Sequence, residues 1–100
     1  MKDFVDLTGV SGASYRFRRL SDGEAHQRIA GNYAVLKARA GGFTVRFVGA
    51  TNDLSLARSE CRPEVLKGGH LYVRLNVPRE LREAEQADLA ANYGLGEEGE

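Results

Sequence analysis

Two carboxylates lie one helical turn apart near the C-terminal end of this chain. Glu85 and Asp88 are three residues apart, so a helix would place them on the same side. Carboxylate oxygens are the ligands that hard divalent cations prefer, and a pair of this kind could hold one. Acidic residues also commonly line the exposed side of a helix, where water solvates them. The sequence leaves both interpretations of the pair open.

Arginines on expected strands form the second group that could do chemistry. Arg46 and Arg74 each alternate with apolar residues, which predicts that both side chains lie on polar strand faces. A guanidinium there either remains solvated or contacts a phosphate. Residues 1–77 hold 12 basic and 7 acidic residues, whereas residues 78–100 hold 2 and 7. The body of the chain could therefore attract phosphate, although such an asymmetry is also common without a nucleic-acid partner.

Cysteine and histidine supply no recognisable metal or nucleophile site. Cys61 is the single cysteine, so it forms neither an internal disulfide nor a cysteine-based zinc site, and a half-buried thiol is expected. His26 and His70 have no second metal ligand at a recognisable spacing. A single cysteine, no signal-peptide pattern and no long apolar run together predict a cytoplasmic protein without membrane association.

Alternation between apolar and polar side chains marks the strands that must position these residues. Residues 3–7 and 14–20 are expected to be two short strands joined by a glycine-containing turn. Residues 31–39 and 43–49 flank a Gly-Gly turn and form the clearest hairpin. In its second strand, one face is expected to carry Phe43, Val45 and Phe47.

Capping residues and prolines mark the helices. A short helix is expected through residues 54–58, because the N-cap residues Thr51, Asn52 and Asp53 precede it. Residues 70–76 alternate again and predict another strand. Pro78 opens the longest helix, which is expected to end near Tyr93, before Gly94.

These elements predict one α+β domain over residues 1–94, followed by a flexible acidic tail at residues 95–100. The expected fold is a small antiparallel or mixed sheet with a central hairpin. A short helix follows the hairpin, and a long C-terminal helix packs on the sheet.

Three local motifs occur in order along the second part of the chain. Gly31-Asn32-Tyr33 opens the hairpin, Phe47-Val48-Gly49 closes it, and Glu85 lies in the final helix. Together they resemble the GIY-YIG nuclease family, especially its small single-domain bacterial members. The resemblance covers about residues 31–93 and implies a GIY-YIG-like fold that acts on DNA.

The resemblance also implies roles for individual residues. Glu85 matches the carboxylate that holds one Mg²⁺ or Mn²⁺ ion, which would neutralise charge on the scissile phosphate. Tyr33 matches the tyrosine that positions or deprotonates the attacking water. An arginine on the short helix would bind the phosphate and stabilise charge in the transition state. The residue nearest to that position which can do so is Arg58.

Two positions depart from the family pattern. Phe47 stands where the family has its second tyrosine, and Ala57 stands where it has the arginine. Phenylalanine has no hydroxyl to hold a water, and alanine has no charge to offer a phosphate. Arg58 is displaced by one residue, or about 100° around a helix. These departures predict impaired catalysis.

Three functions are therefore considered. The first is a GIY-YIG-like domain that binds DNA and cuts it slowly or not at all. The alternative is a catalytically inactive protein-binding or regulatory module on the same fold, favoured by the missing groups, the zero net charge and the acidic tail. The third is an active nuclease in which Arg58 or Arg46 takes the missing role. Any nuclease-like function requires Tyr33 and Glu85 to point into one shared hollow.

Overall fold

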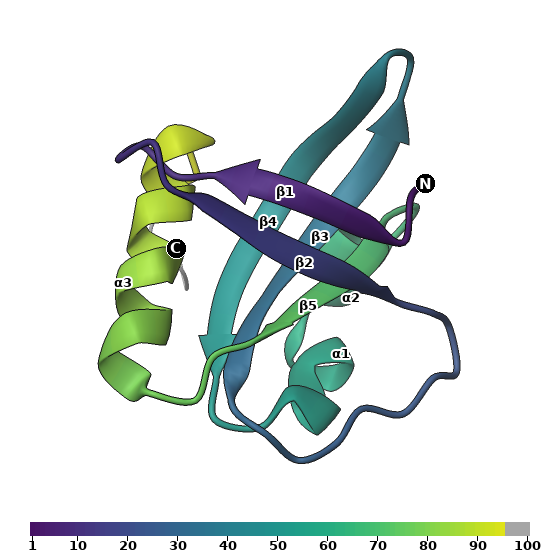
Figure 1. The fold of residues 1–100 in the computed structure, drawn as a ribbon. Helices are drawn as coiled ribbons and strands as arrows, with labels where there is room; N and C mark the ends of the chain where they lie inside the picture. Colours follow the sequence, from purple (N-terminus) through teal and green to yellow (C-terminus); the bar gives the residue numbers. More distant parts are fainter. Residues whose placement is uncertain (96–100) are drawn as a thin grey trace.

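A computed structural model describes residues 1–95 of the chain, and these residues form a curled antiparallel sheet with helices packed against it (Figure 1). The strands are β1 (Phe4–Thr8), β2 (Ser14–Leu20), β3 (Gly31–Arg39), β4 (Gly42–Thr51) and β5 (His70–Leu75). The helices are a 3-10 turn η1 (Leu54–Leu56), α1 (Ala57–Glu60), α2 (Pro63–Leu66) and α3 (Arg79–Asn92). The α+β class predicted from the sequence is confirmed.

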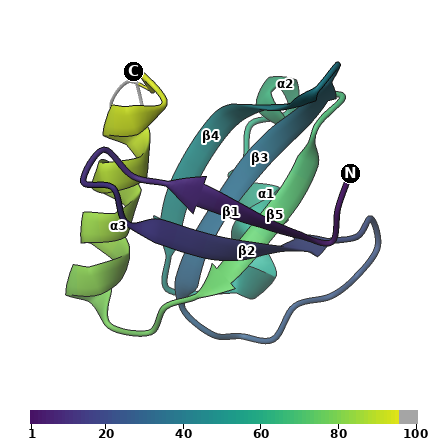
Figure 2. The ribbon, with the colours of Figure 1, turned by 45° about the horizontal axis from the view of Figure 1, so that its top comes forward.

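The strands are neighbours in the order β1-β2-β5-β3-β4, and every neighbouring pair is antiparallel. Strand β3, which lies between β5 and β4, is buried along residues 31–36, because a strand packs on each side of it and apolar groups cover both of its faces. Figure 2 shows β1 and β2 crossing over β3 and β4, with α1 and α2 on the other side of the sheet.

Each face of the sheet carries its own hydrophobic cluster. The inner face lies inside the curl and against α3, and its buried residues are Val5, Leu7, Phe17, Ala34, Leu36, Val45, Val48, Tyr72 and Leu89. The outer face lies against η1, α1 and α2, and its buried residues are Leu20, Tyr33, Val35, Leu54, Ala57, Cys61, Leu71 and Val73. Leu95, expected in a flexible tail, packs on the inner cluster, and the rest of that tail lies outside the described residues.

A β-bulge corrects one prediction about β4. Val35 pairs with Phe47, but the next residue, Leu36, pairs with Val45, so Arg46 is an extra residue in β4. An extra residue reverses the alternation of side chains along a strand. Phe43 and Val45 therefore face the inner cluster, whereas Phe47 packs on the outer cluster. The expectation that these three side chains share one face is wrong for Phe47.

Gly31 begins β3 at a point where β5 and η1 approach the backbone closely. A Cβ atom on Gly31 would lie 2.2 Å from the carbonyl oxygen of Arg74 and 2.6 Å from a methyl carbon of Leu54. The carbonyl belongs to a paired strand and cannot turn aside. Glycine is therefore required at this position for steric reasons.

We predict that Gly31→Ala lowers the free energy of unfolding by about 1–3 kcal/mol, because β5 must shift to admit the methyl group. Urea denaturation followed by circular dichroism measures this change. Gly42→Ala is the matched control, because a Cβ there meets no atom within 4 Å. Equal denaturation midpoints for the two variants would contradict the steric explanation.

Candidate functional site

Tyr33 is a core residue of the outer face. Its side chain is 5% exposed, and its ring centroid lies 5.7 Å from that of Phe47. The ring also covers Gly49, since a Cβ on that glycine would lie 2.6 Å from the ring carbon that carries the hydroxyl. Ala57, at the position of the expected arginine, belongs to the same buried cluster. Tyr33 thus helps to pack the sheet against η1 and α1.

Glu85 lies on the other side of the sheet, in a half-buried ion pair with Arg74. The Arg74 Nε atom donates to Glu85 Oε1 over 2.9 Å, and the two side chains are 30% and 15% exposed. The Arg74 guanidinium also lies 5.4 Å from the ring centroid of Tyr15 and donates to the Arg16 carbonyl over 3.4 Å. The residue expected to hold a metal and one expected to contact phosphate therefore bind each other.

Strand register fixes the relative position of Tyr33 and Glu85. Across the β3–β5 pair, Tyr33 lies opposite Val73, and the next residues along, Asn32 and Arg74, lie opposite each other. Adjacent residues of a strand point to opposite faces. Arg74 and its partner Glu85 are therefore on the inner side, and Tyr33 is on the outer side. The shared hollow that the nuclease hypothesis requires is not formed.

The other candidate ligand of a metal, Asp88, is fully engaged by the turn between β1 and β2. Its carboxylate accepts hydrogen bonds from the Ser11 amide over 2.9 Å, the Ser11 hydroxyl over 2.6 Å and the Tyr15 hydroxyl over 2.8 Å. The Ser11 hydroxyl, and then the Ser11 amide, hold the pKa of Asp88 below its usual value. The hydrogen bond that the Tyr15 hydroxyl donates to Asp88 raises the pKa of Tyr15.

The site does not fit the Mg²⁺ or Mn²⁺ ion that the family resemblance implies. A metal at Glu85 would have to compete with the Arg74 guanidinium, and a metal at Asp88 would have to compete with three hydrogen-bond donors. Among residues 1–95, no three His, Cys, Asp or Glu side chains are grouped so that they could hold a metal ion. The two carboxylates instead fasten α3 to β5 and to the β1–β2 turn.

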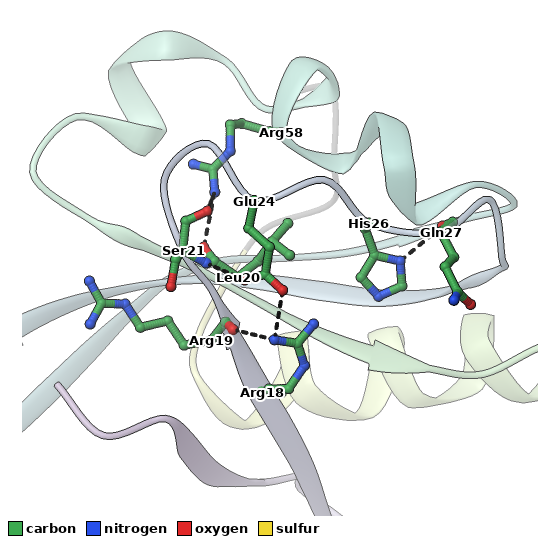
Figure 3. A network of polar contacts seen from close by, with 8 residues as sticks. All are labelled: Arg18, Arg19, Leu20, Ser21, Glu24, His26, Gln27 and Arg58. Atoms are coloured by element: carbon green, nitrogen blue, oxygen red, sulfur yellow. Dashed lines mark hydrogen bonds and ion pairs between the residues drawn. The ribbon is translucent and has the colours of Figure 1, made fainter.

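Arg58 fastens α1 to the loop that follows β2. Its Nη2 atom donates to the carbonyls of Leu20 and Ser21 over 3.0 and 3.3 Å, and its Nη1 atom lies 3.5 Å from Asp22. Figure 3 shows the guanidinium directed at this loop. It also shows Glu24 of the loop in contact with Arg18 of β2. None of these contacts of Arg58 is with Tyr33 or Glu85.

Arg46 is placed by the bulge and fastens α2 to β4. It donates from Nη1 to the Lys67 carbonyl over 2.8 Å and from Nη2 to the Glu64 carbonyl over 3.4 Å. Its two partners are neutral carbonyls, so the positive charge of Arg46 is retained at the surface. Of the five residues selected from the sequence, only Glu85 and Arg74 are brought into contact with each other.

Two features escaped the sequence interpretation. One is a group of cations on the outer side of the β3–β4 hairpin, formed by Lys37, Arg39, Arg46 and Lys67 and called here the hairpin cations. The alternation of residues 33–39 was a signal for it, because Lys37 and Arg39 follow Tyr33 and Val35 on one face. The other is a groove of about 540 Å³ between the sheet and the loop after β2.

No family model, curated protein or solved structure matches this chain. The resemblance to the GIY-YIG family therefore stays a prediction from three short motifs. None of the helices within residues 1–95 is both long enough and apolar enough to cross a membrane.

We predict that Asp88→Asn lowers the melting temperature at neutral pH, and that this difference shrinks in acid. A carboxyl whose pKa is depressed by folding stabilises the native state above its unfolded pKa, near 3.8. That contribution is lost as the pH falls through the lower, folded pKa. Thermal unfolding from neutral pH to about pH 3 checks this. A difference that stays constant over the whole range would rule out titration of Asp88 as its cause.

Proposed function

We propose that the protein binds nucleic acid through the hairpin cations and does not cut it. The observation that carries this proposal is the charge of the β3–β4 hairpin. Residues 31–51, the two strands and their turn, contain three cations, Lys37, Arg39 and Arg46, and no aspartate or glutamate. The far end of the hairpin extends beyond the rest of the sheet in Figure 1, and residues 37–42 are exposed.

Local contacts gather the hairpin cations on one side. Lys37 lies on the outer face of β3, and its side chain passes 3.9 Å from where a Cβ on Gly68 would be. Lys67 immediately precedes that glycine, and its carbonyl accepts a hydrogen bond from Arg46. Arg39 donates from Nε to the Phe43 carbonyl across the hairpin turn over 3.3 Å. Two strands and the end of α2 thus present four positive charges together.

The hairpin cations are not neutralised within the described part of the chain. The ion pairs of residues 1–95 engage the arginines at positions 16, 18, 58, 74 and 79, and none of the hairpin cations is among them. Unpaired cations gathered on a projecting hairpin attract a phosphate backbone and release its condensed counterions. A two-stranded ribbon is also narrow enough to enter the major groove of a duplex.

The resemblance supports nucleic acid as the ligand, and the site geometry argues against cleavage. The hairpin, two short helices, a strand and a long helix follow one another in the order that the resemblance implies. Catalysis would need Tyr33, an arginine and a metal-bound carboxylate around one phosphate. Here Tyr33 is buried on one face, and Glu85 is paired with Arg74 on the other.

We predict no metal-dependent cleavage. Supercoiled plasmid incubated with the protein and Mg²⁺ or Mn²⁺ should remain intact, as it should with Glu85→Gln, because no metal-bound carboxylate faces Tyr33. Agarose gels of the time course measure this. Nicking that disappears in both Glu85→Gln and Tyr33→Phe would show that the two residues act in one active site, and the proposal would fail.

We predict that Lys37→Glu combined with Lys67→Glu weakens binding of a duplex of about 20 base pairs by at least about tenfold at low salt. The matched control, Lys2→Glu combined with Arg28→Glu, changes the net charge equally at exposed positions away from the hairpin cations. It should retain most of the affinity.

Fluorescence anisotropy over a range of salt concentrations measures both variants. Each lost phosphate contact should reduce the slope of log K against log salt by about 0.9. If both double variants lose affinity to the same extent, binding depends on net charge alone and the assignment to the hairpin is wrong.

A further inference from the structure

The groove beside the loop after β2 is separate from the hairpin cations, and of the five residues selected from the sequence only Arg74 lines it. Its floor is formed by β1, β2 and β5, and residues 24–27 of the loop form its wall. We propose that this groove binds a segment of another protein in which an apolar side chain lies next to carboxylates. The inference does not depend on nucleic-acid binding.

The floor of the groove is an open apolar part of the outer face. Phe4 pairs with Arg18, and Arg18 pairs with Val73, so these three residues form one row across β1, β2 and β5. The helices η1, α1 and α2 pack on the part of this face that lies beyond Val73. Phe4 is 53% exposed and Leu75 is 59% exposed. Two large apolar side chains in a concave site offer an anchor for a ligand side chain.

Arg16 provides the charge that selects the ligand. Its ion pair with Asp6 is exposed, with side chains 66% and 51% accessible. Arg16 donates to Asp6 from Nε over 3.0 Å and from Nη2 over 3.3 Å, and a ligand carboxylate would accept from the same two donors while Asp6 returns to water. The Arg16 guanidinium lies 5.9 Å from the ring centroid of Phe4. A carboxylate bound there would bring the neighbouring ligand residue over Phe4.

The wall of the groove is held in place before any ligand arrives. Glu24 accepts from the Arg18 guanidinium over 3.1 Å and from the Ser21 amide over 3.0 Å, and Figure 3 shows this contact beside His26 and Gln27. At the other end of the loop, the Leu54 amide donates to the Ile29 carbonyl over 2.8 Å. A preformed wall reduces the entropy that binding must overcome.

A peptide fits this groove better than a nucleic acid does. Single-stranded nucleic acid needs successive aromatic platforms along a continuous cationic track. The lining contains two rings, Phe4 of the floor and His26 of the wall, and aliphatic floor residues. Two of its three arginines are already engaged inside the molecule, Arg18 by Glu24 and Arg74 by Glu85. This leaves one readily exchanged cation beside an apolar surface.

Selection of a displayed library of random peptides on the whole protein tests the proposal. The selected peptides should combine Asp or Glu with Leu, Ile or Phe. In anisotropy titrations of a selected peptide, Arg16→Gln and Leu75→Glu should each weaken binding by about tenfold or more, because each removes one of the two contacts. Amide signals of Phe4, Arg16 and Leu75 should shift in ¹⁵N spectra.

The chain offers a matched control for each variant. Arg79→Gln also removes an exposed arginine from a surface ion pair, and Leu81→Glu also places a charge on an exposed leucine, 56% accessible. Both should bind the peptide within about twofold of the wild type, because neither residue lines the groove.

Any of the following results would overturn the proposal. The first is that no peptide is enriched, and the second is that the enriched peptides lack acidic residues. The third is that the control variants lose affinity as much as the groove variants do. Stronger competition by a single-stranded oligonucleotide than by the acidic peptide, with the same dependence on Leu75, would assign the groove to nucleic acid instead.

Discussion

The attachment of α3 to the sheet depends on two carboxylates that face different partners. Glu85 binds Arg74 of β5, and Asp88 binds the turn between β1 and β2. Because β1–β2 and β5 are fixed to the same helix, the curl of the sheet around the inner cluster is fixed as well. Acidic groups used in this way stabilise the fold, and a metal ion would have to compete with their partners for the carboxylate oxygens. The same two contacts therefore hold α3 on the sheet and oppose metal binding by the two carboxylates.

Local patterns predicted most of the elements, because the signals for them are local. Strand alternation, N-cap residues and Pro78 placed the five strands and α3 within about two residues of their observed limits. The strand order and the bulge at Arg46 were not predicted. They depend on how two hydrophobic clusters share one sheet, and no short window of sequence contains that information.

Prediction of the candidate site was less successful, for a physical reason. The motifs gave the residue types but not their directions in space. The partner of Glu85 is Arg74, eleven residues away on another element, and that of Arg58 is a pair of main-chain carbonyls after β2. Whether a charged side chain faces a ligand or fastens two elements together depends on such long-range contacts. The hairpin cations were also missed, although the alternation along β3 and the lack of acidic residues in the hairpin are both visible in the sequence.

The extra residue in β4 has a consequence for how this sequence can change. Before and after Arg46, the strand supplies its apolar side chains to opposite faces, with Val45 on one and Phe47 on the other. Deletion of Arg46 would move every side chain between it and the hairpin turn to the opposite face of the sheet, so Phe43 and Val45 would leave the inner cluster although the amino-acid composition hardly changed. Insertions and deletions at this point should therefore be tolerated far less in evolution than substitutions of the residues themselves.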